Sequence, residues 1–438
     1  GKLGIIILWC CVIPGILRAQ EISFHQDFEE LTDTKPVDQK KWELCKRPYN
    51  SAWGSTDVRY SKTNVPETDS KNRKWKGEVW KGERINALAL LWATKECKDI
   101  QVEVSDLKGA AGAVIPASAV RTHFVRYVMT DELNKDKKGS CGLRPDRTIF
   151  DSSMVADILD IKAMQDLKAY HTQPVWLNIW TPSDAQSGVY RGKLSFKSKN
   201  GKFAPLDIEL KVNERVLPAP RDWAFWLDMW QNPYAVARYY QVPLWSEAHF
   251  EAMRPVMKQL ADAGQKCITT SIMHQPWGGQ TEDPFESMVM RVKKLDGSWE
   301  YDYAVFDKWV EFALSMGIDR EINCYSMIPW KLSFRYYDQA SDGMKFVNAK
   351  VGSSEYREFW FPFLVDFARH LKAKGWFGMT TIAMDERPMD VMQKTLKVIR
   401  KADPEFKVSL AGNYHAEIEP DLYDYCITIG QNFPEEVR

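Results

Sequence analysis

The sequence predicts a multidomain protein, with an N-terminal all-β sandwich region followed by a (β/α)8 TIM-type barrel. A chain of 438 residues is too long for one ordinary hydrophobic core. Short strand-like runs separated by turn residues fill the first half, and strand-like runs alternating with long helical patterns fill the second half. We therefore expect a signal peptide at 1–20, a β-sandwich region of one or two domains at 21–215, and an incomplete barrel at 216–438.

The first twenty residues have the pattern of a secretory signal peptide. Lys2 precedes a short apolar stretch at 3–17, and Ala19 supplies a small residue for cleavage. The apolar stretch is short for a bilayer and Pro14 interrupts it, so a retained membrane helix is the less favoured alternative. We expect an exported protein that is periplasmic, attached to the cell surface or secreted, with no stable membrane span.

The overall composition narrows the classes of ligand. Lys plus Arg and Asp plus Glu each number 59, so the formal net charge is zero. A neutral chain gives no electrostatic reason to expect nucleic acid or an anionic membrane as a partner. Aromatic residues form 13% of the chain and many lie near predicted strand ends. Their flat faces suit sugar rings, although most aromatic residues in proteins belong to the core.

The six cysteines beyond the expected signal peptide are typical of neither a zinc site nor a disulfide framework, because they are widely spaced and contain no CxxC pair. Three of them lie in apolar strand-like runs, where a free thiol behaves as a small hydrophobic group. These are Cys267, Cys324 and Cys426. One disulfide among Cys45, Cys97 and Cys141 is left open.

The β region contains five clear strand-like runs, each bounded by Gly, Pro, Asp or Lys residues. They lie at 87–92, 100–104, 124–129, 175–179 and 193–196. A polar, lysine-rich segment at 131–142 is expected to be a loop.

A stiff linker at 217–220, with two prolines, separates this region from the second half. Six strands are expected beyond it, at 225–229, 267–273, 322–328, 380–384, 408–411 and 426–429. Long helices are expected at 246–263, 303–316, 355–374 and 389–401. Gly264, Gly317 and Gly375 follow three of these helices, where a left-handed residue ends a helix well. Six strands favour a barrel that stops roughly two βα units short of eight, so we expect a fragment.

Active sites of such barrels lie at the carboxyl ends of the strands, so the residues there are the candidates. They are acids, amides, aromatic residues and imidazoles, which together suit a sugar pocket. The strand ends supply Asp228, Trp230, His274, Trp277, Tyr325, Trp330, Asp385, Glu386, Asn413 and Tyr414. Structural alternatives exist for several of them: Asp228 can cap a turn, His274 can bond to backbone, the three tryptophans can close the barrel top, and Tyr325 can be core.

The adjacent acids Asp385 and Glu386 are the strongest candidates for chemistry. Consecutive residues of a strand point to opposite faces, so these two share a pocket only if the strand ends there. Pro388 lacks the backbone donor that a strand needs, which predicts an end between Asp385 and Pro388. The alternative is that they are loop acids beside a helix that begins near Met389. The chain has no phosphate loop, nucleophile elbow or HExxH motif, and we expect no cofactor and no metal.

Several blocks of the sequence closely resemble glycoside hydrolase family 123. In the second half they are 227–240, 273–277, 323–326, 383–388 and 412–415, and in the first half they are 80–84 and 124–133. The resemblance implies an exo-acting β-N-acetylgalactosaminidase that retains configuration by substrate-assisted catalysis. Its expected partner is a glycan or glycolipid with a terminal β-linked N-acetylgalactosamine.

The resemblance also implies roles for individual residues. Asp385 would orient the 2-acetamido group and stabilise the oxazolinium-like charge, and Glu386 would protonate the leaving oxygen and then activate water. Trp277 and Trp330 would stack on sugar, and the remaining candidates would contact hydroxyl and acetamido groups: Asp228, His274, Tyr325, Asn413 and Tyr414. The alternatives are a non-catalytic carbohydrate-binding protein, another β-hexosaminidase, and a conventional retaining glycosidase with a carboxylate nucleophile.

Overall fold

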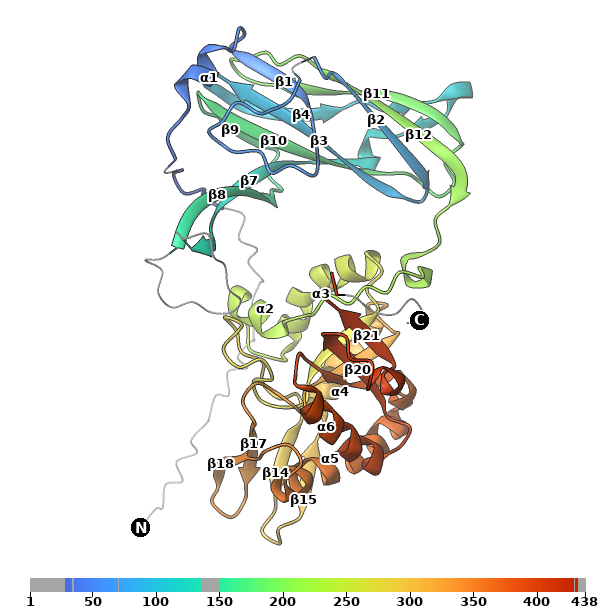
Figure 1. Cartoon of the computed structure of the whole chain (residues 1–438). Helices are drawn as coiled ribbons and strands as arrows, with labels where there is room; N and C mark the ends of the chain where they lie inside the picture. The colour runs from blue at the N-terminus through green and yellow to red at the C-terminus, as the bar shows by residue number, and fades with distance from the viewer. Residues whose placement is uncertain (1–27, 34, 70, 135–149, 429, 432–438) are drawn as a thin grey trace, which may run out of the picture. The chain divides into compact units, whose positions relative to one another are not determined.

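A computed structural model of the chain describes residues 28–33, 35–69, 71–134, 150–428, 430 and 431 (Figure 1). The expected signal peptide, Cys141 and most of the expected loop at 131–142 lie outside the described residues. The chain divides into one compact unit at His25–Asp222 and another that continues from Trp223.

The N-terminal unit consists of two sheets. The first is antiparallel and has the order β1 (Tyr49–Gly54), β3 (Arg84–Ala93), β10 (His171–Trp180), β7 (Val120–Asn134) and β8 (Phe150–Leu159). The second has the order β2 (Lys74–Lys81), β12 (Leu206–Val216), β11 (Gly188–Lys197), β4 (Cys97–Val104) and β9 (Met164–Leu167). The short strand β5 (Leu107–Lys108) pairs with β11, and β6 (Val114–Ile115) pairs with β5. One short helix, α1 (Gln39–Glu43), precedes the strands.

The two sheets of this unit stack on each other (Figure 1) and share one hydrophobic core. Leu91 and Leu177 from the first sheet are fully buried together with Leu194 and Leu210 from the second. The described β region is therefore a single sandwich. The expected runs lie within β3, β4, β7, β10 and β11.

One expectation for this unit was wrong in part. The segment expected to be a loop from residue 131 begins inside β7, which continues to Asn134 and pairs with β8. Its polar composition hid the strand, because ladder hydrogen bonds between backbone groups do not require apolar side chains.

The described residues of the second unit form a parallel sheet, a small additional sheet and five α-helices (Figure 1). The parallel strands are β13 (Cys267–Ser271), β16 (Glu321–Tyr325), β19 (Thr380–Met384), β20 (Lys407–Gly412) and β21 (Asp424–Ile427). The helices are α2 (Pro233–Tyr240), α3 (Glu247–Asp262), α4 (Ala304–Ser315), α5 (Ser354–Lys374) and α6 (Met389–Ala402). Among the described helices, none is both long enough and apolar enough to cross a membrane.

The helix ends follow the sequence closely. Ser246 and Ser353 accept hydrogen bonds from backbone N–H groups in the first turns of α3 and α5. Gly264, Gly317 and Gly375 have φ angles of 86°, 90° and 74°, which confirms the left-handed residues expected after three helices. Helix α2 was not predicted, because its eight residues are too few to show a clear period.

A four-stranded sheet was also missed. It has the order β15 (Trp299–Asp302), β14 (Met290–Lys293), β17 (Ser333–Asp338) and β18 (Gly343–Asn348). Its strands have four to six residues and many exposed side chains, so they lack the continuous apolar runs by which the parallel strands were recognised.

The parallel strands lie side by side in the order in which they occur along the chain, β13-β16-β19-β20-β21. The first of the six expected strands, at 225–229, forms only one isolated bridge, between Leu227 and Gln265. The described residues therefore form an open sheet of five strands, and the expected barrel is not seen as a closed ring.

The sheet is nevertheless strongly curved. Cys267 and Asp424 belong to the two edge strands, β13 and β21, which would lie about 19 Å apart in a flat sheet of five strands. Their ligand atoms, the Sγ of Cys267 and a carboxylate oxygen of Asp424, instead lie within 4.8 Å of each other. Residues on this concave face can thus meet across the sheet.

Candidate active site

The two faces of the parallel sheet differ in chemistry. Ile322, Cys324, Ile382 and Met384 are fully buried in the core that also contains the apolar side chains of the helices. The residues between them in sequence lie on the concave face, because successive strand residues alternate. The concave face carries the polar side chains, including Glu321, Asn323, Tyr325, Thr381 and Ser409.

A row of hydrogen bonds crosses this concave face. Asn323 and Thr381 are register partners on β16 and β19. The hydroxyl of Thr381 donates to the Oδ1 of Asn323 at 2.6 Å and lies 2.8 Å from the hydroxyl of Ser409. The amide of Asn323 donates to the Oδ2 of Asp228 at 3.1 Å. This row of hydrogen bonds thus connects the polar side chains of the concave face to Asp228, one of the predicted site residues.

Asp385 follows β19 directly, in phase with Thr381 on the concave face. The strand ends at Met384, one residue before the predicted interval. The Asp385 carboxylate is half-buried, and its Oδ1 accepts the backbone N–H of Glu386 at 2.8 Å. Burial raises the pKa of Asp385, and the charge of Glu386 adds to this, whereas hydrogen bonds from the Glu386 backbone and from Trp277 lower it.

Glu386 is exposed and lies against Gly412, the last residue of β20. A Cβ atom on Gly412 would be 3.2 Å from both the Cα and the Cγ of Glu386, so glycine makes this approach feasible. Helix α6 begins at Met389, and within the described residues no side chain caps its N-terminus. The pair therefore does not cap this helix, which weakens the structural alternative.

Three aromatic rings gather beside the acids. The ring centroids of Trp230, Trp277 and Tyr325 are separated by 4.9 to 5.0 Å in all three pairs. Trp277 is 6% exposed and Tyr325 is 2% exposed, whereas Trp230 is 45% exposed. Trp230 thus exposes part of its ring to solvent, and the predicted stacking residue Trp277 packs against that ring.

Asp228 shares the concave face with these rings. Burial and the charge of Asp424 raise the pKa of Asp228 to about 6, although the bond from Asn323 opposes the shift. Its Oδ1 has no hydrogen-bond partner among the described residues. Burial raises the pKa of Tyr325, and the negative charges of Asp228 and Asp385 raise it further. Both acids therefore act electrostatically on the same phenol.

Trp330 has a different neighbour. Its ring is 48% exposed, and the guanidinium carbon of Arg387 lies 5.0 Å from the ring centroid. The Nε of Arg387 is buried without a partner in the described part of the chain. Because Arg387 directly follows the acidic pair, this contact links Trp330 to the same strand end.

The other predicted residues make contacts of their own at the carboxyl edge. The Nδ1 of His274 lies 2.8 Å from the Oε2 of Glu286, which also contacts Arg335. Asn413 accepts a hydrogen bond from the side chain of Gln431. The ring of Tyr414 stacks on Tyr425 with centroids 5.9 Å apart. These residues line the same edge of the sheet. The hydrogen bonds of His274 and Asn413, however, join them to Glu286 and Gln431 and not to Asp385.

Sequence reasoning missed four residues that hold this region together: Asn323, Arg387, Glu286 and Gln431. Asn323 was detectable, because it is two residues before Tyr325 in the same strand and must share its face. Arg387 was detectable as a neighbour of the pair. Glu286 and Gln431 lie in segments without periodicity, so no pattern indicated them.

Comparisons with known proteins give two family matches. Residues 230–438 match Glycoside hydrolase 123, catalytic domain, and residues 53–198 match Glycoside hydrolase 123 N-terminal domain. No curated protein matches the chain.

Solved structures give a similar result. The chain is similar to a family 123 glycoside hydrolase from Clostridium perfringens, whose solved structure addresses glycolipid glycan hydrolysis. The two are 25% identical, and they align with a TM-score of 0.78 over 87% of this chain and 67% of that one. A Bacteroides ovatus GH5 xyloglucanase aligns over 82% of this chain and 68% of that one, with 8% identity. Its TM-score is 0.22.

Proposed function

The chain belongs to glycoside hydrolase family 123 and is a glycosidase, and from this premise we propose that it is an exo-acting, retaining β-N-acetylgalactosaminidase that uses substrate-assisted catalysis. The observation that carries the proposal is the placement of Asp385 and Glu386. One acid is half-buried on the concave face beside aromatic rings, and the other is exposed against Gly412 at the same strand end.

In this proposal the nucleophile belongs to the substrate. The carbonyl oxygen of the 2-acetamido group attacks the anomeric carbon, the bond to the leaving oxygen breaks, and Glu386 gives that oxygen its proton. Water then attacks the anomeric carbon, gives a proton to Glu386 and opens the oxazolinium ring. The two inversions produce overall retention without a covalent bond to the enzyme.

Asp385 has the position needed to support the acetamido group. The Glu386 N–H donates to one of its oxygens and Trp277 also donates to the carboxylate, and these bonds fix its orientation. Because each carboxylate oxygen accepts more than one hydrogen bond, Asp385 can still accept one from a substrate N–H. The raised pKa of Asp385 favours protonation in the free enzyme, which opposes the ionised form that the mechanism needs. A cationic oxazolinium beside the carboxylate would lower that pKa again during the reaction.

The substrate class follows from the family and from the exposed aromatic faces. Trp230 and Trp330 offer rings for stacking on sugar, while Asp228 has a buried oxygen without a partner for a hydroxyl donor. The solved structure of the similar Clostridium perfringens enzyme addresses the hydrolysis of glycolipid glycans. We propose terminal β-linked N-acetylgalactosamine on glycans or glycolipids as the substrate of an exported enzyme.

The curved parallel sheet supports a further part of the proposal, that the catalytic unit is built on a (β/α)8 barrel. Sequential strand order and alternating helices are the connections that such a barrel uses. The approach of β13 and β21 across the concave face gives the required curvature.

A panel of nitrophenyl β-glycosides tests the reaction. The enzyme should hydrolyse the N-acetylgalactosaminide faster than the N-acetylglucosaminide, and it should leave the galactoside and glucoside intact. Equal hydrolysis of sugars with and without the acetamido group would refute substrate assistance. A covalent sugar trapped by a 2-fluoro sugar would instead indicate a carboxylate nucleophile. Glycan binding without any product over long incubation would favour the non-catalytic alternative.

A further inference from the structure

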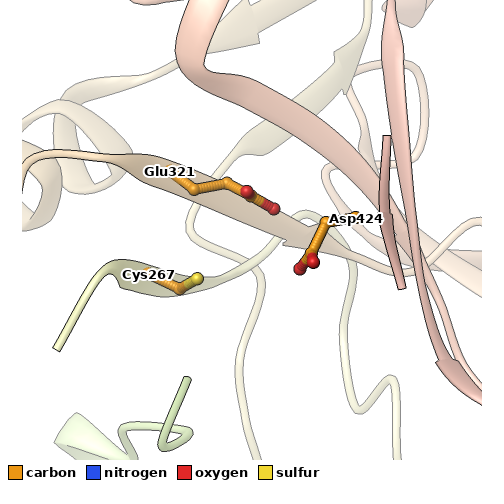
Figure 2. Close-up of side chains that lie close together, drawn as sticks. All are labelled: Cys267, Glu321 and Asp424. Carbon is orange, nitrogen blue, oxygen red and sulfur yellow. The ribbon is translucent and has the colours of Figure 1, made fainter. Parts of the chain in front are cut away.

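A second cluster of ionisable side chains lies on the concave face, at the opposite ends of the strands from Asp385. Cys267, Glu321 and Asp424 are the first residues of β13, β16 and β21. One ligand atom from each, a thiol sulfur and two carboxylate oxygens, lies within 4.8 Å of both of the others. Figure 2 shows the three side chains converging from three strands toward one point.

Glu321 has an unusual environment within this cluster. It is 1% exposed, and neither of its carboxylate oxygens has a hydrogen-bond partner among the described residues. Its carboxylate points toward Asp424 (Figure 2). Buried polar groups are nearly always hydrogen-bonded, and a buried carboxylate without any partner is costly. The cluster itself therefore does not provide the partner that the Glu321 carboxylate needs.

The nearby charges make the need for a cation stronger. Asp228 lies close enough to the cluster for its charge to act on both Glu321 and Cys267. The positive charge of Lys407 also acts on Glu321, but its ammonium donates to the carbonyl of Gly378 and lies 3.8 Å from the centroid of the Tyr423 ring, so it does not pair with the carboxylate. Several acids thus converge with a thiol in a buried region of low dielectric.

We propose that Cys267, Glu321 and Asp424 bind one divalent metal ion of the zinc type. A cysteine sulfur with two carboxylate oxygens is a donor set that Zn²⁺ accepts, whereas Mg²⁺ and Ca²⁺ prefer oxygen alone. Tetrahedral bonds of about 2.0 to 2.3 Å would bring the ligand atoms to about 3.5 Å from one another, so atoms that already lie within 4.8 Å need only a small movement of the side chains to bind. Asp424 is only half-buried, which leaves a path to the site.

The proposed ion would have a structural role. It would join β13 to β21, the two edge strands of the parallel sheet, through ligands that come one from each strand. Such a site leaves no spacing motif in the sequence, which explains why the sequence alone predicted no metal. It is separate from the acidic pair, because Asp385 lies beyond the carboxyl end of β19.

Cobalt provides a direct test, since Co²⁺ replaces Zn²⁺ in such sites and a thiolate ligand gives it a charge-transfer absorption band. Chelator-treated whole protein should bind one equivalent of Co²⁺ with this band, and Zn²⁺ should displace it and raise the melting temperature. Cys267→Ser should abolish the band. Glu321→Gln should weaken the binding by at least about tenfold, since even indirect partners of a metal contribute that much.

Two matched variants control for other thiols. Cys426→Ser removes an exposed cysteine from the same strand as Asp424, and Cys324→Ser removes a buried one from the same strand as Glu321. Both should keep the band. Absence of binding to the wild-type protein, or a band that survives in a folded Cys267→Ser protein, would overturn the proposal. Circular dichroism shows whether each variant is folded, and Glu321→Gln provides an independent test if Cys267→Ser is not.

Discussion

Gly412 and Glu386 are in such close contact that the residue at position 412 controls where the proposed acid/base lies. The Cα and Cγ atoms of Glu386 would each be 3.2 Å from a Cβ on Gly412, and its backbone nitrogen would be 3.4 Å away. Gly412 ends β20, and Glu386 follows the neighbouring strand β19. The absence of one methyl group on one strand therefore sets the position of a carboxylate on the next.

Gly412→Ala should displace Glu386 by a few tenths of an ångström and reduce kcat/KM by about tenfold, because misplacement of a catalytic group is costly. The melting temperature should fall modestly, because two of the three close atoms, the Cα and the nitrogen of Glu386, belong to the backbone. Gly378→Ala is the matched control, because nothing lies within 4 Å of a Cβ at that position. Unchanged kinetics in Gly412→Ala would mean that the position of Glu386 is not critical.

Asp385→Asn and Glu386→Gln should each reduce turnover by on the order of 100- to 10,000-fold, the usual contribution of a group that transfers or stabilises charge. Azide should restore the Glu386→Gln enzyme on a nitrophenyl substrate, because the activated leaving group needs no proton and azide replaces water as the nucleophile. The product should be a β-glycosyl azide, detected by mass spectrometry and NMR. Azide rescue of Asp385→Asn but not of Glu386→Gln would reverse the two roles.

The sequence predicted the elements of the second unit better than their assembly. Apolar runs separated by long periodic helices identified five parallel strands, because a parallel strand that is buried on both faces carries mostly apolar residues along its length. A full strand was predicted at 225–229, but this segment forms only one isolated bridge. Whether the strands close into a ring depends on hydrogen bonds between edges, and composition carries no information on these.

The candidate site shows the same limit. Placement at strand ends was predictable for Asp385 and Glu386, because a proline shortly after an apolar run ends a strand. The exposure of individual rings was not predictable: Trp277 is buried, whereas Trp230 and the predicted residue Trp330 are exposed. Cys426 was expected to behave as a small hydrophobic group in an apolar run, and it is exposed. These differences arise from tertiary contacts between segments far apart in sequence.

Trp277→Phe should shift the acidic limb of the pH profile of kcat/KM toward higher pH. Burial already raises the pKa of Asp385, and the Trp277 hydrogen bond lowers it. Phenylalanine keeps a ring beside Tyr325 but lacks the donor, so the carboxylate should protonate more easily and lose activity at a higher pH. Tyr234→Phe, which removes a hydroxyl that donates to the Glu286 backbone, is a control. A limb that stays fixed, or moves to lower pH, would show that Asp385 does not set it.

Asp228→Asn should stabilise the protein relative to the wild type, and this gain should be larger near neutral pH than at about pH 4. The pKa of Asp228 is raised from 3.8 to about 6 in the folded state. Between these values the folded protein binds more protons than the unfolded chain, so wild-type stability falls as pH rises through this interval. Asparagine carries no charge and avoids that loss. Urea unfolding in the presence of a chelator, at several pH values, measures the difference without a contribution from bound metal.

Asp390→Asn should show the opposite trend. The Lys394 ammonium lowers the pKa of Asp390, an exposed residue of α6, so its ion pair stabilises the folded state only when the carboxylate is charged. Removal of that carboxylate should cost a small amount of stability near neutral pH and nothing once acid has protonated it. If the Asp228→Asn and Asp390→Asn proteins show the same pH trend relative to the wild type, the difference does not come from the burial of Asp228.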